Sequence, residues 1–199
     1  MSLLSTRRTF IAGCIAACAL AAGPAQALTE QEARSLVDKV VSEVQTVINS
    51  GKSDAAVLRD LERVFVKYAD VNIMAQYALG VDGRSASAAQ KRAFSNAFQG
   101  YIARKYGKQF KDFIGGRVEV EQVSAIRNGF DVKTKAYLRG QQPFDVSFHV
   151  SDKSGSDKFF NVYIEGVNLL LTERTEIGSM LDRRGGDINA VVADLKKLG

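Results

Sequence analysis

The sequence contains few of the residue types that build most enzymatic and metal-binding sites. Its 199 residues include two cysteines, one histidine, two prolines and no tryptophan. Both cysteines, Cys14 and Cys18, stand in the first 27 residues, so the remaining chain has no thiol and only His149 as an imidazole. These counts exclude a disulfide scaffold, a cysteine zinc site, a Cys–His dyad and a site with several histidine ligands. We therefore expect no cofactor and no metal ion.

Acidic residues are absent before Glu30, and this part of the chain has the pattern of an export signal. Two basic residues, Arg7 and Arg8, precede the apolar small-residue run Phe10–Ala22, and residues 25–27 form an A-x-A cleavage site. Such a run is too short for a transmembrane helix, which needs about 20 apolar residues. The pattern predicts a signal peptide over residues 1–27 and one domain over residues 28–199.

Two further patterns bear on how this leader is processed. The segment Thr6–Ile11 resembles the twin-arginine export consensus, although paired arginines also occur in Sec signals. The segment Ile15–Cys18 fits a lipobox in which Cys18 would be acylated, but the cleavage site after Ala27 competes with it. We favour twin-arginine export followed by cleavage before Leu28.

The basic excess is small and scattered. The chain has 27 Lys and Arg against 22 Asp and Glu, a formal charge of +5. Loss of Arg7 and Arg8 with the leader would reduce this charge to +3. Because no basic block is interleaved with aromatic residues, we expect no nucleic-acid partner.

Helical patterns come first in the remaining chain. A capping box at Thr29–Glu32 opens an amphipathic segment that runs to about Ile48. Three more helical segments are predicted from their capping residues, which are Ser53 or Asp54, Asp70 and Ser87. The last of these segments is predicted to extend through Phe113.

Alternating patterns typical of strands follow Gly115-Gly116. The first two predicted strands begin at Val118 and at Phe130. The third, over 144–150, has the clearest alternation, and two more follow over 160–164 and Val167–Leu171. Two helices, about Thr172–Arg183 and Asp187–Leu198, close the chain. Helices, then antiparallel strands, then helices indicate an α+β fold.

Candidate catalytic groups are few. His149, Asp131 and Asp145 alternate with apolar neighbours on predicted strands. A carboxylate pair could serve acid–base chemistry, but the alternation favours water-facing positions for all three.

The content of large apolar and aromatic residues is the more distinctive feature. The chain has 11 Phe and 6 Tyr, and they are concentrated on the fourth helical segment and the strands. They could fill a solid core, or a curved sheet and a long helix could enclose a cavity for an apolar ligand. Composition alone leaves both interpretations open.

Several segments carry a family resemblance when read in order. They are Asp70–Gly80 (DVNIMAQYALG), the aromatic series from Gln90 to Tyr106, Phe160–Leu169 (FNVYIEGVNL), Arg174 with Ile177, and the closing segment from Gly186 to Leu195. In this order and spacing the chain resembles the MlaC family of periplasmic phospholipid-binding proteins, also called toluene-tolerance proteins. It departs from the family pattern in lacking a tryptophan and in having Asn161, Asn168 and Ile177 where the family has aspartate, serine and an aromatic residue.

The resemblance implies a cone-like architecture similar to nuclear-transport-factor-like domains, with a curved antiparallel sheet wrapped by helices. It also implies a soluble, monomeric carrier that moves phospholipid through the periplasm. The partners would be an outer-membrane lipoprotein complex and an inner-membrane ABC transporter complex, and the role would be to maintain outer-membrane lipid asymmetry.

On this interpretation, strand alternation and helix faces predict the residues that hold the acyl chains. The helical wall would comprise Met74, Tyr77, Phe98, Tyr101 and Ile102. The strand wall would comprise Phe130, Val132, Phe144, Val146, Phe148, Phe160, Val162, Val167 and Leu169. Arg174 would either orient a phosphate or brace the helix that carries it.

Two rival hypotheses remain. One is an enzyme on a similar cone-shaped fold that uses Asp131 or Asp145 as a base, which requires a carboxylate directed into the cavity. The other is a structural adaptor with a solid core, which requires that there be no cavity.

Overall fold

The computed structural model describes residues 27–107 and 114–198. The predicted leader and its Cys18 therefore lie outside the described residues, except for Ala27, as do Phe110 and Phe113 of the predicted fourth helix. In the described ranges, six α-helices, one short 3-10 turn and a five-stranded sheet occur in three groups along the chain. This is the α+β arrangement that the order of the sequence patterns predicts.

The first group is helical. It consists of α1 (Glu30–Ile48), α2 (Asp54–Tyr68), α3 (Val71–Leu79), the 3-10 turn Asp82–Arg84 and α4 (Ala88–Gly107). Predicted caps are present at three starts: Thr29 and Glu32 form the capping box of α1, the Asp70 carboxylate accepts from the Ile73 amide, and Ser87 and Gln90 bond reciprocally at the start of α4.

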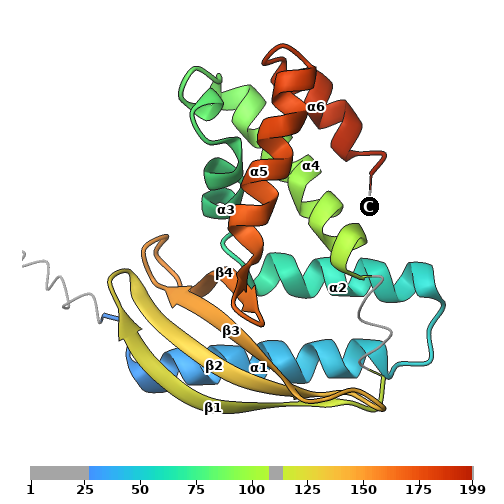
Figure 1. Ribbon diagram of the computed structural model, residues 1–199, viewed down its shortest axis with the longest axis vertical. Helices are drawn as coiled ribbons and strands as arrows, with labels where there is room; N and C mark the ends of the chain where they lie inside the picture. The colour runs from blue at the N-terminus through green and yellow to red at the C-terminus, as the bar shows by residue number, and fades with distance from the viewer. Residues whose placement is uncertain (1–26, 108–113, 199) are drawn as a thin grey trace, which may run out of the picture.

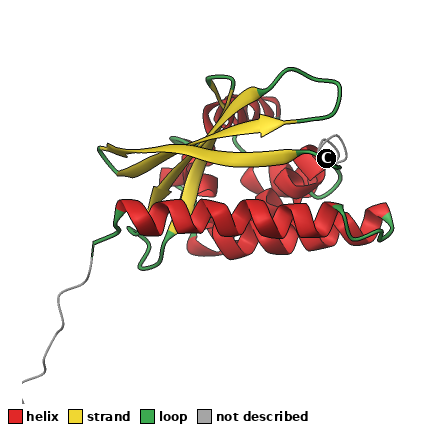
Figure 2. Ribbon diagram, turned by 90° about the horizontal axis from the view of Figure 1, so that it is seen from below, coloured by secondary structure: helices red, strands yellow, loops and turns green. Residues whose placement is uncertain are grey.

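The sheet is an antiparallel meander with the strands in sequence order (Figure 1). The strands are β1 (Arg117–Ile126), β2 (Gly129–Tyr137), β3 (Phe144–Ser151), β4 (Lys158–Ile164) and the short β5 (Val167–Asn168). The long strands bend around α1, which packs against the sheet with α2 beside it (Figures 1 and 2).

The closing helices are α5 (Leu169–Arg183) and α6 (Ile188–Leu195). The strand predicted over Val167–Leu171 is therefore wrong beyond Asn168, because the Asn168 side chain accepts from the Leu171 amide and starts α5 there. Helices α3, α4, α5 and α6 pack together beyond α2 and form the upper part of the molecule in Figure 1.

The two faces of the sheet differ in character, as strand alternation predicts. Val132 pairs with Phe148 on the face toward α1, and Val132 is fully buried there. The neighbouring pair, Asp131 and His149, therefore lies on the opposite face. Asp145 alternates in the same way, is 67% exposed and forms an ion pair with Lys135. Both carboxylates of the enzyme hypothesis thus lie on the face away from α1.

Asp131 and His149 are less exposed than their alternation suggests. Their side chains are only 16% and 21% exposed. The rings of Tyr163 and Phe160 lie against His149, with centroids 4.7 and 5.7 Å away. The outer face therefore carries a small aromatic cluster that shields the imidazole from water.

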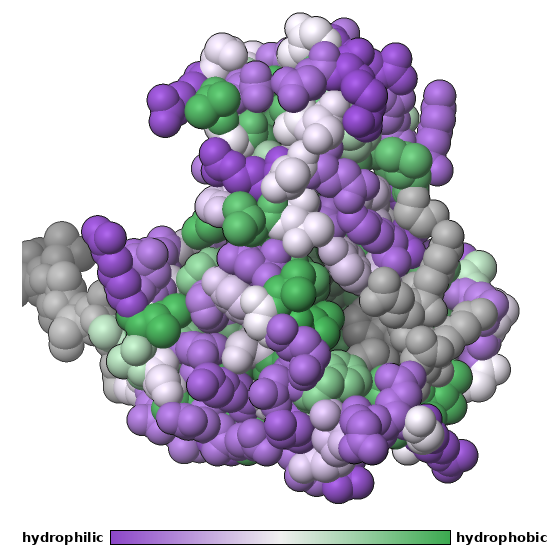
Figure 3. All heavy atoms as spheres, viewed as in Figure 1, coloured by the Kyte–Doolittle hydropathy of each residue, from purple (hydrophilic) through white to green (hydrophobic). Residues whose placement is uncertain are grey.

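The visible molecular surface in Figure 3 is mainly hydrophilic, with apolar side chains gathered where the helical part meets the sheet. Exposed large apolar residues on α3 and around the start of α5 include Ile73, Tyr77, Val167 and Leu171. Most of the apolar side chains of the described residues are instead turned inward.

We predict that His149 makes the stability of the fold pH-dependent. Burial lowers the pKa of His149 below its ordinary value of 6.5, and the Asp131 carboxylate only partly opposes this. The unfolded chain then takes up a proton before the folded chain does, so the free energy of unfolding falls as the pH drops below about 6.5.

The measurement is urea unfolding of the wild type and of His149→Gln at pH 7.5, 6.5 and 5.5. We expect the stability advantage of the wild type over the variant to decrease toward the lowest pH. A difference that stays constant across the three pH values would contradict the prediction.

Candidate functional site

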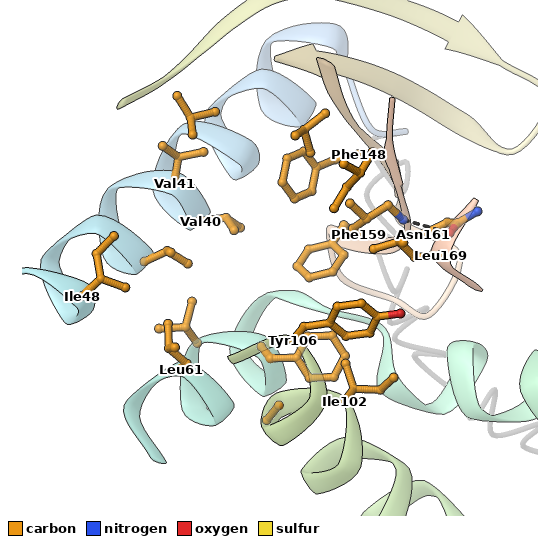
Figure 4. Close-up of a pocket in the computed structure, with 18 of the residues that line it drawn as sticks. Val40, Val41, Ile48, Leu61, Ile102, Tyr106, Phe148, Phe159, Asn161 and Leu169 are labelled. Carbon is orange, nitrogen blue, oxygen red and sulfur yellow. Dashed lines mark hydrogen bonds between the residues drawn. The ribbon is translucent and has the colours of Figure 1, made fainter. Parts of the chain in front are cut away.

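An apolar cavity lies between the sheet and the helices. Its volume is about 210 Å³, many times the roughly 10–15 Å³ that one buried water requires. It is partly open, and its walls come from α1, α2, α3, α4, β1, β3, β4 and α5 (Figure 4). Apolar side chains dominate the walls, as is usual for ligand pockets. The lining residues are Val40, Val41, Val44, Gln45, Ile48, Leu61, Val64, Phe65, Met74, Ile102, Ala103, Tyr106, Gly116, Arg117, Val118, Val146, Phe148, Phe159, Asn161, Val162, Ile164, Leu169, Leu170 and Glu173.

Helix α1 supplies one wall of the cavity. It has more apolar residues than it needs to pack along one line of contact with the core. Val40, Val44 and Ile48 recur at four-residue intervals, and Val41 widens the stripe on the same side. Ala33 and Val37, nearer the start of α1, are fully buried in the core instead. One apolar stripe therefore serves the core at its beginning and the cavity at its end.

Three aromatic rings form part of the cavity wall. Phe159 lies between Phe148, whose ring meets it edge-on at 5.7 Å, and Phe65 of α2, whose centroid is 6.0 Å away. These rings link β3 and β4 to α2 and are rigid, so they give the cavity a fixed wall.

A β-bulge in β4 decides which phenylalanine reaches the cavity. His149 pairs with Asn161, but the next residue, Val150, pairs with Phe159, so that Phe160 is the extra residue. An extra residue reverses the alternation on one side of the bulge. Phe159 is consequently 5% exposed and lines the cavity, whereas Phe160 lies against His149 on the outer face.

Two asparagines determine where α5 begins relative to the sheet. The Asn161 Oδ1 atom accepts from the Leu170 amide at 3.2 Å, and its Nδ2 atom donates to Asn168 Oδ1 at 3.0 Å. Asn168 Oδ1 in turn accepts from the Leu171 amide at 2.9 Å. Because the first helical amides have no partner within their own helix, these bonds attach the start of α5 to β4. Leu169 and Leu170 thereby line the cavity.

The structure brings part of the predicted site together. Six of the predicted residues line the cavity: Met74, Ile102, Val146, Phe148, Val162 and Leu169. Four others point inward but pack in the core: Phe98, Tyr101, Phe130 and Val132.

The remaining predicted residues lie elsewhere. Phe160 is displaced by the bulge, and Phe144 is half-buried beyond Val146 near the start of β3. Tyr77 and Val167 are 40% and 55% exposed, because α3 turns Tyr77 outward and β5 is too short to be covered. Neither they nor Phe144 belong to the described residues of the cavity wall.

Arg174 braces two helices. Its Nη1 atom donates to the Tyr77 carbonyl at 3.3 Å, and its guanidinium lies 4.9 Å from the centre of the Tyr77 ring. The contact is close to Gly80 at the end of α3, where an added Cβ would lie 3.2 Å from Nη2. Of the two roles considered for Arg174, this geometry matches the bracing of α5 against α3.

Besides Arg117, Gln45 and Asn161, one charged cluster enters the mainly apolar wall. Lys105 Nζ lies 2.8 Å from Glu173 Oε1 and 2.5 Å from Glu176 Oε2, and it also donates to the Tyr101 hydroxyl at 2.9 Å. The Tyr106 hydroxyl donates to Glu173 Oε1 at 2.5 Å. Glu173 and Tyr106 both line the cavity.

The protonation states in this cluster follow from its packing. Burial alone would lower the pKa of Lys105, but its hydrogen bonds to Glu173 and Glu176 outweigh this and raise the pKa above its ordinary value. Burial raises the pKa of the Tyr106 hydroxyl, and the Glu173 carboxylate adds to the effect. Lys105 therefore stays charged and Tyr106 stays a hydrogen-bond donor.

Sequence reasoning missed the walls supplied by α1 and α2, and it missed Phe159 and Glu173. The width of the apolar stripe at Val40, Val41 and Val44 indicates that this helix lines a cavity as well as packing against the core. Glu173 stands four residues after Leu169 and three after Leu170, so an acid on an apolar helix face was a signal as well.

Over residues 27–107 and 114–198, no group of three or more His, Cys, Asp or Glu is placed to hold a metal ion. Among the helices in the same ranges, none is long and apolar enough to cross a membrane.

The fold is similar to that of a solved structure, the phospholipid-binding protein from Ralstonia solanacearum in complex with a phospholipid. The superposition has a TM-score of 0.72 and covers 83% of this chain and 95% of that chain. The two sequences are 20% identical, so the similarity establishes a shared fold.

The MlaC protein family matches this chain over residues 35–197. The match covers every described element except the first residues of α1. It agrees with the segments on which the resemblance rests, from the Asp70 cap of α3 to the closing helix. The chain belongs to the MlaC protein family.

Proposed function

We propose that this protein is a periplasmic phospholipid carrier that holds acyl chains in the cavity between the sheet and the helices. The observation that carries the proposal is the apolar cavity itself, whose walls extend from Val40 on α1 to Leu169 on α5. Family membership and the fold shared with a phospholipid-bound structure support the same ligand class.

The energetics of lipid transfer explain why such a cavity is needed. Removing each methylene from water is worth about 0.8 kcal/mol, so two chains with roughly 30 methylenes represent about 24 kcal/mol. Lipid with that surface exposed does not cross water at a useful rate. A carrier that buries the chains removes most of this barrier and can leave the polar head group near the opening.

The same energetics require assistance at release. A ligand buried this favourably leaves only if the cavity changes shape, which a partner achieves by binding one conformation better than the other. We propose that the partners are an inner-membrane ABC lipid transporter complex and an outer-membrane lipoprotein complex. The carrier would shuttle between them as a monomer and so help to maintain outer-membrane lipid asymmetry.

The proposed compartment rests on the leader over residues 1–27, whose twin-arginine-like pattern would export the chain to the periplasm. The remaining domain, residues 28–199, would then contain no cysteine, because both cysteines lie in the leader. A scattered charge of +3 on that domain is compatible with weak attraction to acidic partners or anionic head groups.

The enzyme hypothesis finds less support in the geometry. It placed the base at Asp131 or Asp145, and both lie on the face of the sheet opposite Val132 and Phe148. The described carboxylate in the cavity wall is Glu173, which is already bonded to Lys105 and Tyr106. We therefore favour binding and transport over catalysis.

The first test is lipid extraction. Protein purified from the periplasm and washed free of membranes is expected to yield phospholipid on solvent extraction and mass spectrometry, close to a fixed molar ratio. Protein that contains no phospholipid, and takes up none from vesicles after delipidation, would contradict the proposal.

The second test compares two positions on one segment. Leu169 lines the cavity, whereas Val167 two residues earlier is 55% exposed. Leu169→Asp removes apolar contact and places a carboxylate against the chains, so we expect at least about a tenfold loss of lipid affinity. Val167→Asp is the matched control and should leave the affinity unchanged.

Affinity is measured by titrating delipidated protein with a fluorescent phospholipid, and thermal unfolding of both variants checks that they fold. Equal affinities for folded Leu169→Asp and wild type would show that this cavity does not hold the chains.

A further inference from the structure

Glu173 is an unusual residue for an apolar cavity wall. Its side chain is 2% exposed, and it follows Leu169 and Leu170 on the cavity side of α5. A carboxylate in such a place is costly unless its oxygens are paired. The hydrogen bonds of the two carboxylate oxygens therefore show whether the burial of Glu173 is compensated.

Only one of the two oxygens is satisfied. Glu173 Oε1 accepts from Lys105 Nζ at 2.8 Å and from the Tyr106 hydroxyl at 2.5 Å. Glu173 Oε2 is buried and has no hydrogen-bond partner among residues 27–107 and 114–198. Among the described residues that line the cavity, no other side chain has a buried oxygen or nitrogen without a partner.

The charges around Glu173 come from two helices. The Lys105 ammonium on α4 pairs with both Glu173 and Glu176 on α5, and Arg183 is a second cation near Glu176. The two tyrosine hydroxyls, of Tyr101 and Tyr106, add hydrogen bonds but no charge. A further N–H donor would complete the hydrogen bonding of Glu173, and a positive charge on that donor would strengthen its attraction to the carboxylate.

The cluster extends from the cavity wall toward the surface. Exposure of the side chains rises from 2% at Glu173 to 27% at Lys105 and 43% at Glu176. A lipid with its chains in the apolar part of the cavity would bring its polar end to such a boundary. A donor on the head group would then meet Glu173, while the chains remain against the valines and phenylalanines.

We propose that Glu173 Oε2 accepts a hydrogen bond from the head group of the bound lipid, and that the site selects phospholipids whose ammonium carries at least one N–H donor. This inference rests on the proposed function and names the ligand class of the same cavity. A primary ammonium supplies both N–H donors and positive charge. A quaternary ammonium supplies charge without a donor, and a glycerol head group supplies hydroxyl donors without positive charge.

The test is a competition. Delipidated protein is incubated with vesicles of equal parts phosphatidylethanolamine and phosphatidylcholine with identical chains, and the bound lipids are quantified by mass spectrometry. We expect the wild type to be enriched in phosphatidylethanolamine by about tenfold, the effect of one charge-assisted hydrogen bond. Glu173→Gln should reduce the enrichment to near one.

Glu176→Gln is the matched control. It removes the other carboxylate bonded to Lys105, but Glu176 is not part of the cavity wall. It should keep the enrichment, which separates an effect of the unpaired oxygen from an effect of charge in the cluster.

A second measurement uses the wild type alone, in case Glu173→Gln does not fold. Vesicles that contain the mono-, di- and trimethylated forms of phosphatidylethanolamine remove the N–H donors one at a time. We expect bound lipid to fall most at the last methylation, where the final donor is lost.

The outcomes distinguish this inference from the proposed function. Equal binding of both lipids by the wild type, or the same enrichment in folded Glu173→Gln, would overturn the role of Glu173 and leave the carrier function intact. A wild type that binds neither lipid would overturn both.

Discussion

The attachment of α5 to β4 through Asn161 and Asn168 is the constraint on which the cavity depends. These side chains satisfy amides in the first turn of α5 and join the helix to the sheet. The position of the helix then places Leu169, Leu170 and Glu173 in the cavity wall. A different start would rotate every later residue of α5 by about 100° per position, and the same sequence would present other side chains.

The sheet shows how one apolar face can serve two purposes. Val132 and its neighbours pack against the beginning of α1 and form a filled core. Farther along, Val146, Phe148 and Val162 face an open space between α1 and α5. The difference does not come from the residue types, which are alike. It comes from the bend of the sheet and from the separation of the helices that cover it.

The sequence patterns predicted the element order, the capped helix starts, the alternation of β2 and β3 and the α+β class. These features depend on local hydrogen bonding and on periodicity, both of which a sequence displays directly. The patterns failed at Phe160, where a bulge shifts the alternation by one residue, and at Leu169–Leu171, where a run of leucines continues as helix. Both errors arise from pairing with distant residues, such as Val150 with Phe159 and Asn161 with the Leu170 amide.

The sequence by itself determined which residues are available: a chain almost without thiols and imidazoles, rich in phenylalanine, with family segments from Asp70 to Leu195. It thereby favoured burial of apolar surface over cofactor chemistry. Only the tertiary structure decided which apolar residues fill space and which enclose it, because a cavity is a property of the distance between elements. It alone also revealed Glu173 Oε2 as a buried acceptor without a partner in the described part of the chain, since hydrogen bonding between α4 and α5 cannot be read from either helix alone.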